Sequence, residues 1–195
     1  MIATTFFPEP LPYTGQELRP HFLLTRFGLK GPALGAFIGP CRVDTEHLVD
    51  WEDRLANDRI EARAMVHFLG EFFGATLREG VVLQRLLMAI MAETLNERMA
   101  AKGRIVLRRG DDLFFEDKKL SVSIVTASPV SLLLHSGVNI DPTGAPVPAV
   151  GLPALGVEGL EGPEGARDWA QAVLARFASE TESMEWACAK VRPVV

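Results

Sequence analysis

A lysine, an aspartate and a group of small polar residues lie within one stretch of the chain, and together they could bind an anion. The stretch, residues 109–141, alternates polar and apolar side chains, which is typical of short strands joined by tight turns. Turns at residues 117–118 and 128–130 would place the polar and small residues of these strands on a single face: Asp112, Lys119, Ser121, Ser123, His135, Gly137 and Asn139. The Lys119 ammonium would meet a phosphate or carboxylate as a point charge, while Asn139 and the serines would supply directional hydrogen bonds.

The proposed face depends on the pairing register, because a slip of one residue exchanges the two faces of a strand. In the predicted register Lys119 lies opposite Asn139, and Ser123 lies opposite His135. The other face is then a core face: Leu113, Phe115, Leu120, Val122, Ile124, Leu132, Leu134, Val138 and Ile140. The ordinary alternative is a solvated polar face on which Lys119 pairs with Glu116 across the hairpin.

The acidic segment 44–58 offers a second kind of chemistry. Its carboxylates and imidazole suit hard and borderline cations, and a metal-dependent hydrolase would draw on these residues: His47, Asp50, Glu52, Asp53 and His67. Their spacing matches no established metal site. Acids are also favoured in the first turn of a helix, with Asp44 or Thr45 as the cap, so we assign no metal ligands from the sequence.

The elements that must position these residues are a sheet and two long helices. Residues 21–29 and 34–43 read as strands, whereas 60–73 fit either a helix or a buried strand. The pattern predicts a helix over 77–101, with Arg85 near its start, and one helix or two over 165–190, with a break near 179–183. Residues 1–20 read as an irregular lead-in, and residues 142–163 as an ordered Pro/Gly loop that could cover the polar face.

Length and composition limit the class of protein. The 195 residues, 48% hydrophobic, suit one domain with a sizeable core. A net charge of −5 argues against a nucleic-acid-coating surface, and no apolar run is long enough to span a bilayer. The first residues lack an export signal, and Cys41 and Cys188 form no redox or metal spacing, so we expect a cytoplasmic protein with reduced cysteines. A homodimer is compatible with the apolar loop and outer strands.

The central motifs DDLFFEDKKLSVSI and LLLHSGVNI resemble the catalytic core of the biotin/lipoate protein ligase and octanoyltransferase superfamily. More closely, most of the chain resembles the DUF366 family, whose fold is akin to those ligases; the matching motifs include FIGPCRV, MVHFLGEFF, QRLL, RRGDDL and SPVS. The resemblance implies an α+β fold with a mixed, mainly antiparallel sheet packed against a long helix and a C-terminal helix. It also implies that residues 65–73 form a strand.

The resemblance implies an adenylate-forming ligase or acyl-type transferase acting on a small carboxylic acid, with ATP and Mg as cofactors. Lys119 would be the catalytic residue, stabilising charge between the acid and the α-phosphate. Asp112 would hold magnesium or nucleotide, and Asn139 the ribose or phosphate. The chain departs from the ligases in lacking a Gly-rich phosphate loop before the long helix; Arg63, with Arg59, could take its place, and Arg85 could reach a ligand.

Two alternatives come from other functional classes. The missing Gly-rich loop favours a non-catalytic module that binds a carboxylate or nucleotide without activating it. The acidic segment is the support for a metal-dependent hydrolase.

Overall fold

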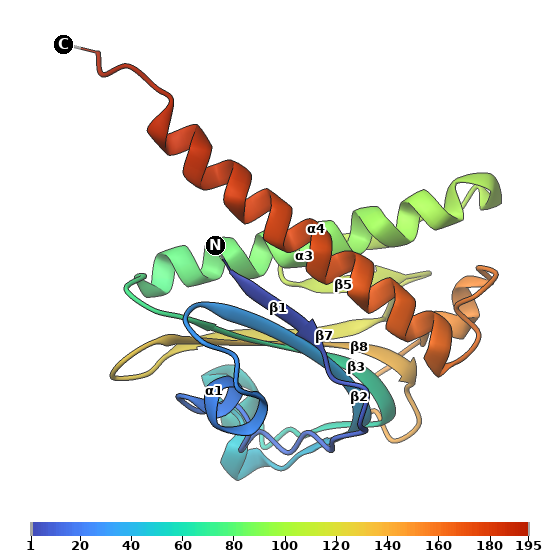
Figure 1. Ribbon diagram of the computed structural model, residues 1–195. Helices are drawn as coiled ribbons and strands as arrows, with labels where there is room; N and C mark the ends of the chain where they lie inside the picture. The colour runs from blue at the N-terminus through green and yellow to red at the C-terminus, as the bar shows by residue number, and fades with distance from the viewer. Residues whose placement is uncertain (1, 195) are drawn as a thin grey trace.

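A five-stranded sheet forms the centre of the molecule in the computed structural model, which describes residues 2–194 (Figure 1). The strand order is β1-β2-β3-β8-β7, comprising β1 (Ala3–Phe6), β2 (Ala33–Val43), β3 (Ile60–Phe72), β8 (Leu132–Asp141) and β7 (Ser121–Ala127). β1 pairs in parallel with β2, and the other neighbours pair antiparallel. The mixed, mainly antiparallel sheet predicted from the sequence is confirmed.

Two long helices, α3 (Leu77–Met99) and α4 (Pro163–Ala189), cover one face of this sheet (Figure 1). Between the helices and the sheet lies the larger core, in which Phe68 and Trp169 are fully buried and meet edge-on at 5.9 Å. The indole N–H of Trp169 donates to Thr94 Oγ1 at 3.0 Å, so the one polar group of this buried side chain has a hydrogen-bond partner.

The opposite face of the sheet packs against the N-terminal segment and the short helix α1 (Phe22–Phe27) (Figure 1). This second core contains Tyr13, Phe37, Met65 and Leu69, all nearly inaccessible to solvent. The 3-10 turn η1 (Thr45–His47) and the helix α2 (Trp51–Leu55) follow β2 along the chain.

A three-stranded sheet of β4 (Leu107–Arg109), β5 (Asp112–Phe115) and β6 (Lys118–Lys119) precedes β7 along the chain. Glu116 and Asp117 both have positive φ, 50° and 60°, and make the two-residue turn between β5 and β6. The turn predicted at residues 117–118 is therefore wrong by one residue, and Phe114 lies opposite Lys119. Lys119 N donates to Pro148 O, and Val150 N donates to Lys119 O, so the loop before the 3-10 turn η3 (Leu152–Leu155) runs beside Lys119. The short 3-10 turn η2 (Ala100–Lys102) ends α3.

A capping box begins α3. The Thr76 hydroxyl accepts from Glu79 N at 3.3 Å, and the Glu79 carboxylate accepts from Thr76 N at 2.6 Å. We expect Thr76→Ala to lower the free energy of unfolding by about 1 kcal/mol, because a helix N–H loses its partner. Urea denaturation of Thr76→Ala and Thr76→Ser measures this, and an equal loss in the serine variant, which keeps the hydroxyl, would contradict the capping role.

Most predicted elements are confirmed, and three are wrong. The strand over residues 65–73 forms as part of β3, and the long helix forms as α3. Residues 21–29 form α1 instead of a strand, the lead-in contains β1, and α4 continues through 179–183 without a break. α1 begins at a point where Glu71, a buried carboxylate, accepts from His21 N at 2.9 Å, a long-range contact that no local pattern reveals.

The predicted register of the central hairpin is wrong by one residue. Ser128 N donates to Ser131 O, which closes a four-residue loop and pairs Ala127 with Leu132. Ser123 therefore pairs with Ser136, and His135 pairs with Ile124. Since the slip is odd, Ser121 and Ser123 of β7 lie on the opposite face of the sheet from His135, Gly137 and Asn139 of β8.

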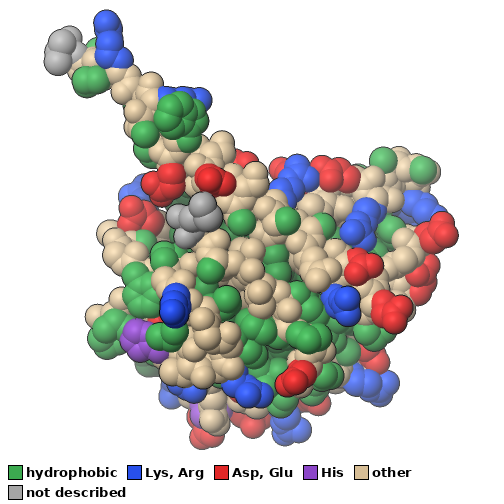
Figure 2. Space-filling view, viewed as in Figure 1, with side chains coloured by type: hydrophobic (Ala, Val, Ile, Leu, Met, Phe, Trp, Pro, Cys, Tyr) green, Lys and Arg blue, Asp and Glu red, His purple; other side chains and the backbone are tan. Residues whose placement is uncertain are grey.

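The C-terminal part of α4 extends away from the body of the molecule (Figure 2). Trp186 on this part is 65% exposed, and Met184 is 39% exposed. Among residues 2–194, none of the helices combines the length and the apolar character required to cross a membrane.

Candidate functional site

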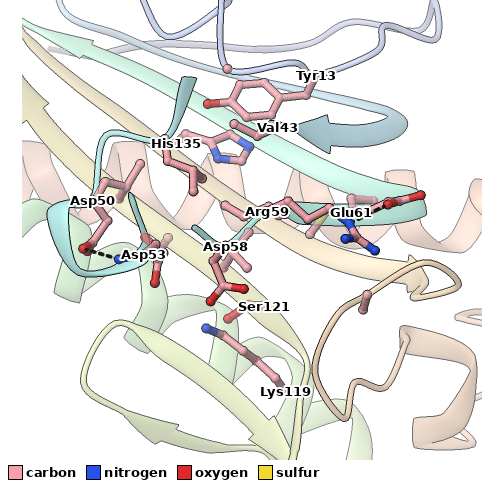
Figure 3. Close-up of a pocket in the computed structure, with 18 of the residues that line it drawn as sticks. Tyr13, Val43, Asp50, Asp53, Asp58, Arg59, Glu61, Lys119, Ser121 and His135 are labelled. Carbon is pink, nitrogen blue, oxygen red and sulfur yellow. Dashed lines mark hydrogen bonds and ion pairs between the residues drawn. The ribbon is translucent and has the colours of Figure 1, made fainter. Parts of the chain in front are cut away.

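A cavity of about 240 Å³ opens on the face of the sheet that carries the N-terminal segment (Figure 3). Its walls come from residues far apart in the sequence: Tyr13, Val43, the segment around Asp50–Arg59, Met65, the β6–β7 region, His135, Asn139 and the loop residues Ala145–Ala149. The volume suits a small acid, since cavities for drug-sized ligands usually hold about 300–1,000 Å³.

Lys119 lies at one end of this cavity (Figure 3). Its Nζ is 2.9 Å from Asp112 Oδ2, and its side chain remains 33% exposed. The β5–β6 turn places Lys119 opposite Phe114, and the backbone bonds to Pro148 and Val150 hold it against the 145–149 loop. The ion-pair partner is Asp112, not Glu116, so the ordinary pairing expected from the sequence is wrong.

Acidic side chains dominate the rest of the rim. Among the lining residues, six carboxylates face two cationic side chains: Asp50, Asp53, Asp58, Glu61, Asp111 and Asp112 against Arg59 and Lys119. Both cations are paired, Arg59 with Glu61 at 3.1 Å and Lys119 with Asp112 at 2.9 Å. Among the described lining residues Lys119 is the more enclosed cation, with 33% of its side chain exposed against 55% for Arg59, so it is the better placed of the two to hold a ligand inside the cavity.

Burial and crowding act on two of these carboxyl groups. Burial raises the pKa of Asp112, and neighbouring Asp111 and Asp53 raise it further, while Lys119 opposes the shift. The pKa of Asp53 is also raised, first by burial and then by Asp50, again with Lys119 opposing. The two carboxyl groups therefore hold protons more readily than isolated aspartates do.

A buried pair of histidines lies at the other end of the cavity. His67 Nδ1 is 3.0 Å from His135 Nε2, and His67 Nε2 is 3.2 Å from Gly39 O. The Tyr13 ring stacks on His135 with centroids 3.7 Å apart and planes at 8° (Figure 3). Burial lowers the pKa of His67 to about 3 and that of His135 well below its usual value, so both imidazoles are neutral near neutral pH.

The predicted site residues separate into two groups. Those lining the cavity are Asp112, Lys119, Ser121, Ser123, His135 and Asn139. Asn139 Nδ2 donates to Val150 O at 3.2 Å, and so helps to hold the loop beside Lys119. Gly137 does not line the cavity: an added Cβ would lie 2.7 Å from Met65 Cε, so Met65 fills the space.

The two serines line the cavity, but their hydroxyl groups are engaged in hydrogen bonds within the protein. Ser121 is fully buried and accepts from Leu113 N at 2.8 Å. Ser123 shares a 2.8 Å hydrogen bond with Ser136 and accepts from Gln84 at 3.0 Å. These bonds tie α3 and β5 to the sheet, and the predicted single polar face is corrected accordingly.

Both predicted arginines lie outside the cavity lining. Arg63 pairs with Asp141 at 3.1 Å and is exposed. Arg85 pairs with Asp111 at 3.5 Å, from α3. Arg63, near the start of β3, therefore does not reach the cavity.

The structure adds residues that the sequence pattern did not identify. Tyr13 lies in the Pro-rich lead-in, and its backbone forms an isolated β-bridge with Cys41 of β2. Asp58 lies just after α2. Tyr13 is the one tyrosine of the chain, which is the signal that could have singled it out. His67, a candidate metal ligand in the sequence, is buried in the sheet beside His135.

The cysteines and the acidic segment provide no further reactive group in residues 2–194. Cys41 is buried, and burial raises its pKa to about 12, so it does not form a thiolate near neutral pH. Cys188 is exposed near the end of α4, away from the cavity lining. No group of three or more His, Cys, Asp or Glu side chains is arranged to hold a metal ion in the part of the chain that the structure describes.

A family model described as "Domain of unknown function (DUF366)" matches residues 2–192. The chain belongs to the DUF366 family. An uncharacterized protein of Methanocaldococcus jannaschii is 28% identical over 199 residues, covering 100% of this chain and 86% of the relative.

Solved structures extend the comparison from the DUF366 family to a wider fold. A protein of unknown function from Pyrococcus horikoshi superposes with a TM-score of 0.85 at 32% identity, over 99% of this chain and 100% of that one. A biotin protein ligase from Aquifex aeolicus in complex with biotin and ATP superposes with a TM-score of 0.55 at 16% identity, over 90% of this chain and 69% of the ligase. The DUF366 chain therefore has a biotin protein ligase-like fold.

Proposed function

We propose that this DUF366 protein binds a small carboxylic acid at Lys119 and ligates or transfers its acyl group. The observation that carries the proposal is the ammonium of Lys119, which is one-third exposed on the wall of a cavity of about 240 Å³. The biotin protein ligase-like fold supports it, because the structurally similar ligase holds an acid, biotin, together with ATP.

Lys119 has an electrostatic role in this proposal. A ligand carboxylate would replace Asp112 as the partner of the ammonium, and the same ammonium would stabilise negative charge that develops on the acyl group during activation. Burial and the neighbouring Asp111 and Asp53, which raise the pKa of Asp112, disfavour its charged form and so make it easier for a ligand carboxylate to replace it beside Lys119. A ligase, or a transferase that passes the acyl group directly to its acceptor, fits better than a transferase with a cysteine nucleophile. Cys41 is buried, and its pKa is raised to about 12.

The residues present fit the acid better than they fit a nucleotide. Asp112 and Asp53 are the carboxylates that would hold Mg²⁺ beside Lys119, since this ion usually takes one or two protein carboxylates and completes its shell with phosphates and water. Bound Mg–ATP would supply the adenylyl group that activates the acid, and pyrophosphate would leave. No Gly-rich cradle precedes β3, however, and the acidic rim repels a free triphosphate.

The acidic rim also supports a second candidate, a binding module that holds a small carboxylate without turnover. In this case Lys119 binds the acid, but the missing phosphate cradle leaves it without an activating group. The metal-dependent hydrolase has no comparable support, because the described residues contain no arranged group of metal ligands.

The test is a thermal-shift screen against small carboxylic acids, with and without Mg–ATP, followed by pyrophosphate exchange for each acid that binds. Ligand at about 100 times its Kd should add about 2.7 kcal/mol to the stability. Acid-dependent exchange supports the ligase, binding without turnover supports the module, and the absence of any acid-induced shift would overturn both.

The ion pair predicts a pH dependence of anion binding. We expect a short alkanesulfonate, which stays ionised, to bind more tightly as pH falls through the raised pKa of Asp112, because protonation of that carboxyl group frees Lys119. Asp53 also faces Lys119 with a raised pKa and adds in the same direction. Calorimetric titration over acidic pH measures the effect.

Asp112→Asn is the matched variant for this experiment. It should bind the sulfonate more tightly than the wild type at neutral pH and lose most of the pH dependence. An unchanged dependence in this variant would show that Asp112 does not control access to Lys119.

A further inference from the structure

The buried histidine pair connects the interior of the sheet with the wall of the cavity. His67 lies on β3 and His135 on β8, and each is at most 2% exposed. Figure 3 shows His135 beneath the Tyr13 ring, at the end of the cavity remote from Lys119. The pair has no part in binding the carboxylate at Lys119, so its function needs a separate explanation.

The contacts of the pair determine which ring nitrogens carry protons. Gly39 O can only accept, so His67 Nε2 must carry the hydrogen that it donates at 3.2 Å. Each ring is neutral near neutral pH and carries one N–H. His67 Nδ1 is therefore an acceptor, and His135 Nε2, 3.0 Å away, must be the donor.

It follows that His135 Nδ1 has no hydrogen and is an acceptor. Among residues 2–194, the one hydrogen bond of the His135 ring is that of Nε2 with His67, and Nδ1 makes none. Within the same residues, every buried side-chain nitrogen or oxygen that is sealed from solvent has a partner. His135 Nδ1 is thus open to the cavity that the ring lines.

We propose that His135 Nδ1 is a fixed acceptor for the ligand, and that the cavity therefore selects a carboxylic acid carrying an O–H or N–H donor at the end remote from its carboxylate. The inference rests on the proposed function, which places the carboxylate at Lys119. His67 is a positioning residue: it holds the tautomer of His135 through two hydrogen bonds and does not reach the ligand. An acid without such a donor leaves Nδ1 desolvated and unpaired, which weakens its binding.

Two substitutions at His67 separate the tautomer from the packing. His67→Gln keeps a donor for Gly39 O and an acceptor for His135 Nε2–H, so it should keep the tautomer. His67→Phe fills the volume but offers no acceptor, so His135 is no longer held with its hydrogen on Nε2. Thermal unfolding of both variants verifies that they are folded.

The first measurement is the NMR shift of the His135 ring nitrogens in isotopically labelled, ligand-free protein near neutral pH. We expect Nε2 protonated and Nδ1 unprotonated in the wild type and in His67→Gln. A protonated Nδ1 in the wild type overturns the inference and leaves the proposed function intact.

The second measurement titrates ω-hydroxyalkanoates of increasing chain length, their ω-methoxy and unsubstituted counterparts, and the matching neutral alcohols. At the best length, the hydroxy acid should bind about 5- to 10-fold more tightly than the methoxy acid, the effect of one neutral hydrogen bond. This preference should survive in His67→Gln and fall in His67→Phe. Acids that bind with no hydroxyl preference overturn the inference and leave the proposed function intact. Alcohols that bind where acids do not overturn the proposed function, and with it the inferred selection of an acid, and silence throughout overturns both.

Discussion

Replacing Lys119 by methionine is expected to weaken binding of a small carboxylic acid by about 10- to 100-fold. The substitution keeps most of the apolar stem but removes the ammonium, and a hydrogen bond to a charged partner contributes about 1.5–3 kcal/mol. The lining leaves no ready replacement, because Arg59 is engaged with Glu61 and the other charged groups are acids. Isothermal titration with the best acid from the thermal-shift screen measures the loss.

Lys118→Met is the matched control for this substitution. Lys118 is the exposed neighbour on β6, and it does not line the cavity, so its loss should leave affinity within about 2-fold of the wild type. Equal affinity in the Lys119→Met and wild-type proteins would remove Lys119 from the site. Equal losses in both lysine variants would indicate a general charge effect rather than a site.

The second large effect is a loss of stability in acid that originates in the buried histidine pair. The pKa of His67 is about 3 in the folded protein, against about 6.5 in the unfolded chain, and that of His135 is lowered in the same direction. Between these values the unfolded state binds more protons. The free energy of unfolding should therefore keep its full value above about pH 6.5. Below that pH it should fall, by at most about 1.4 kcal/mol per pH unit for each histidine.

His67→Gln should remove about half of this acid dependence, because glutamine replaces the hydrogen bonds but takes up no proton. His47→Gln, which removes a partly exposed imidazole, controls for the loss of a histidine in general. Urea denaturation at a series of pH values between neutral and mildly acidic compares the three proteins. A wild-type slope that persists undiminished in His67→Gln would assign the acid sensitivity to other groups.

Local sequence patterns predicted the elements whose stability is local or strongly periodic. The apolar stripe of α3 and the motifs that surround β3 and β8 led to the correct α+β architecture. The prediction failed at α1, a six-residue helix whose aromatic residues also suit a strand. Its start is held by the distant carboxylate of Glu71, and its Phe22 and Leu23 are buried in the second core.

The register of β7 against β8 shows why the site was only partly predictable. Alternation identifies which residues share a face within one strand, but the parity of the loop decides how two strands combine. The four-residue loop from Ser128 to Ser131 separated the serines from His135, although each strand was assigned correctly by itself.

By itself, the sequence determined the long helix α3 and the alternating strand that carries Asp112, because these depend on periodicity, while the α+β architecture followed from the resemblance of the motifs to a known family. Only the tertiary structure decided what surrounds Lys119. Tyr13, His67 and the acidic rim reach the cavity or its wall through contacts between segments that are distant in sequence. Such contacts form when separate apolar faces are buried together, and no local pattern encodes which polar groups are then enclosed with them.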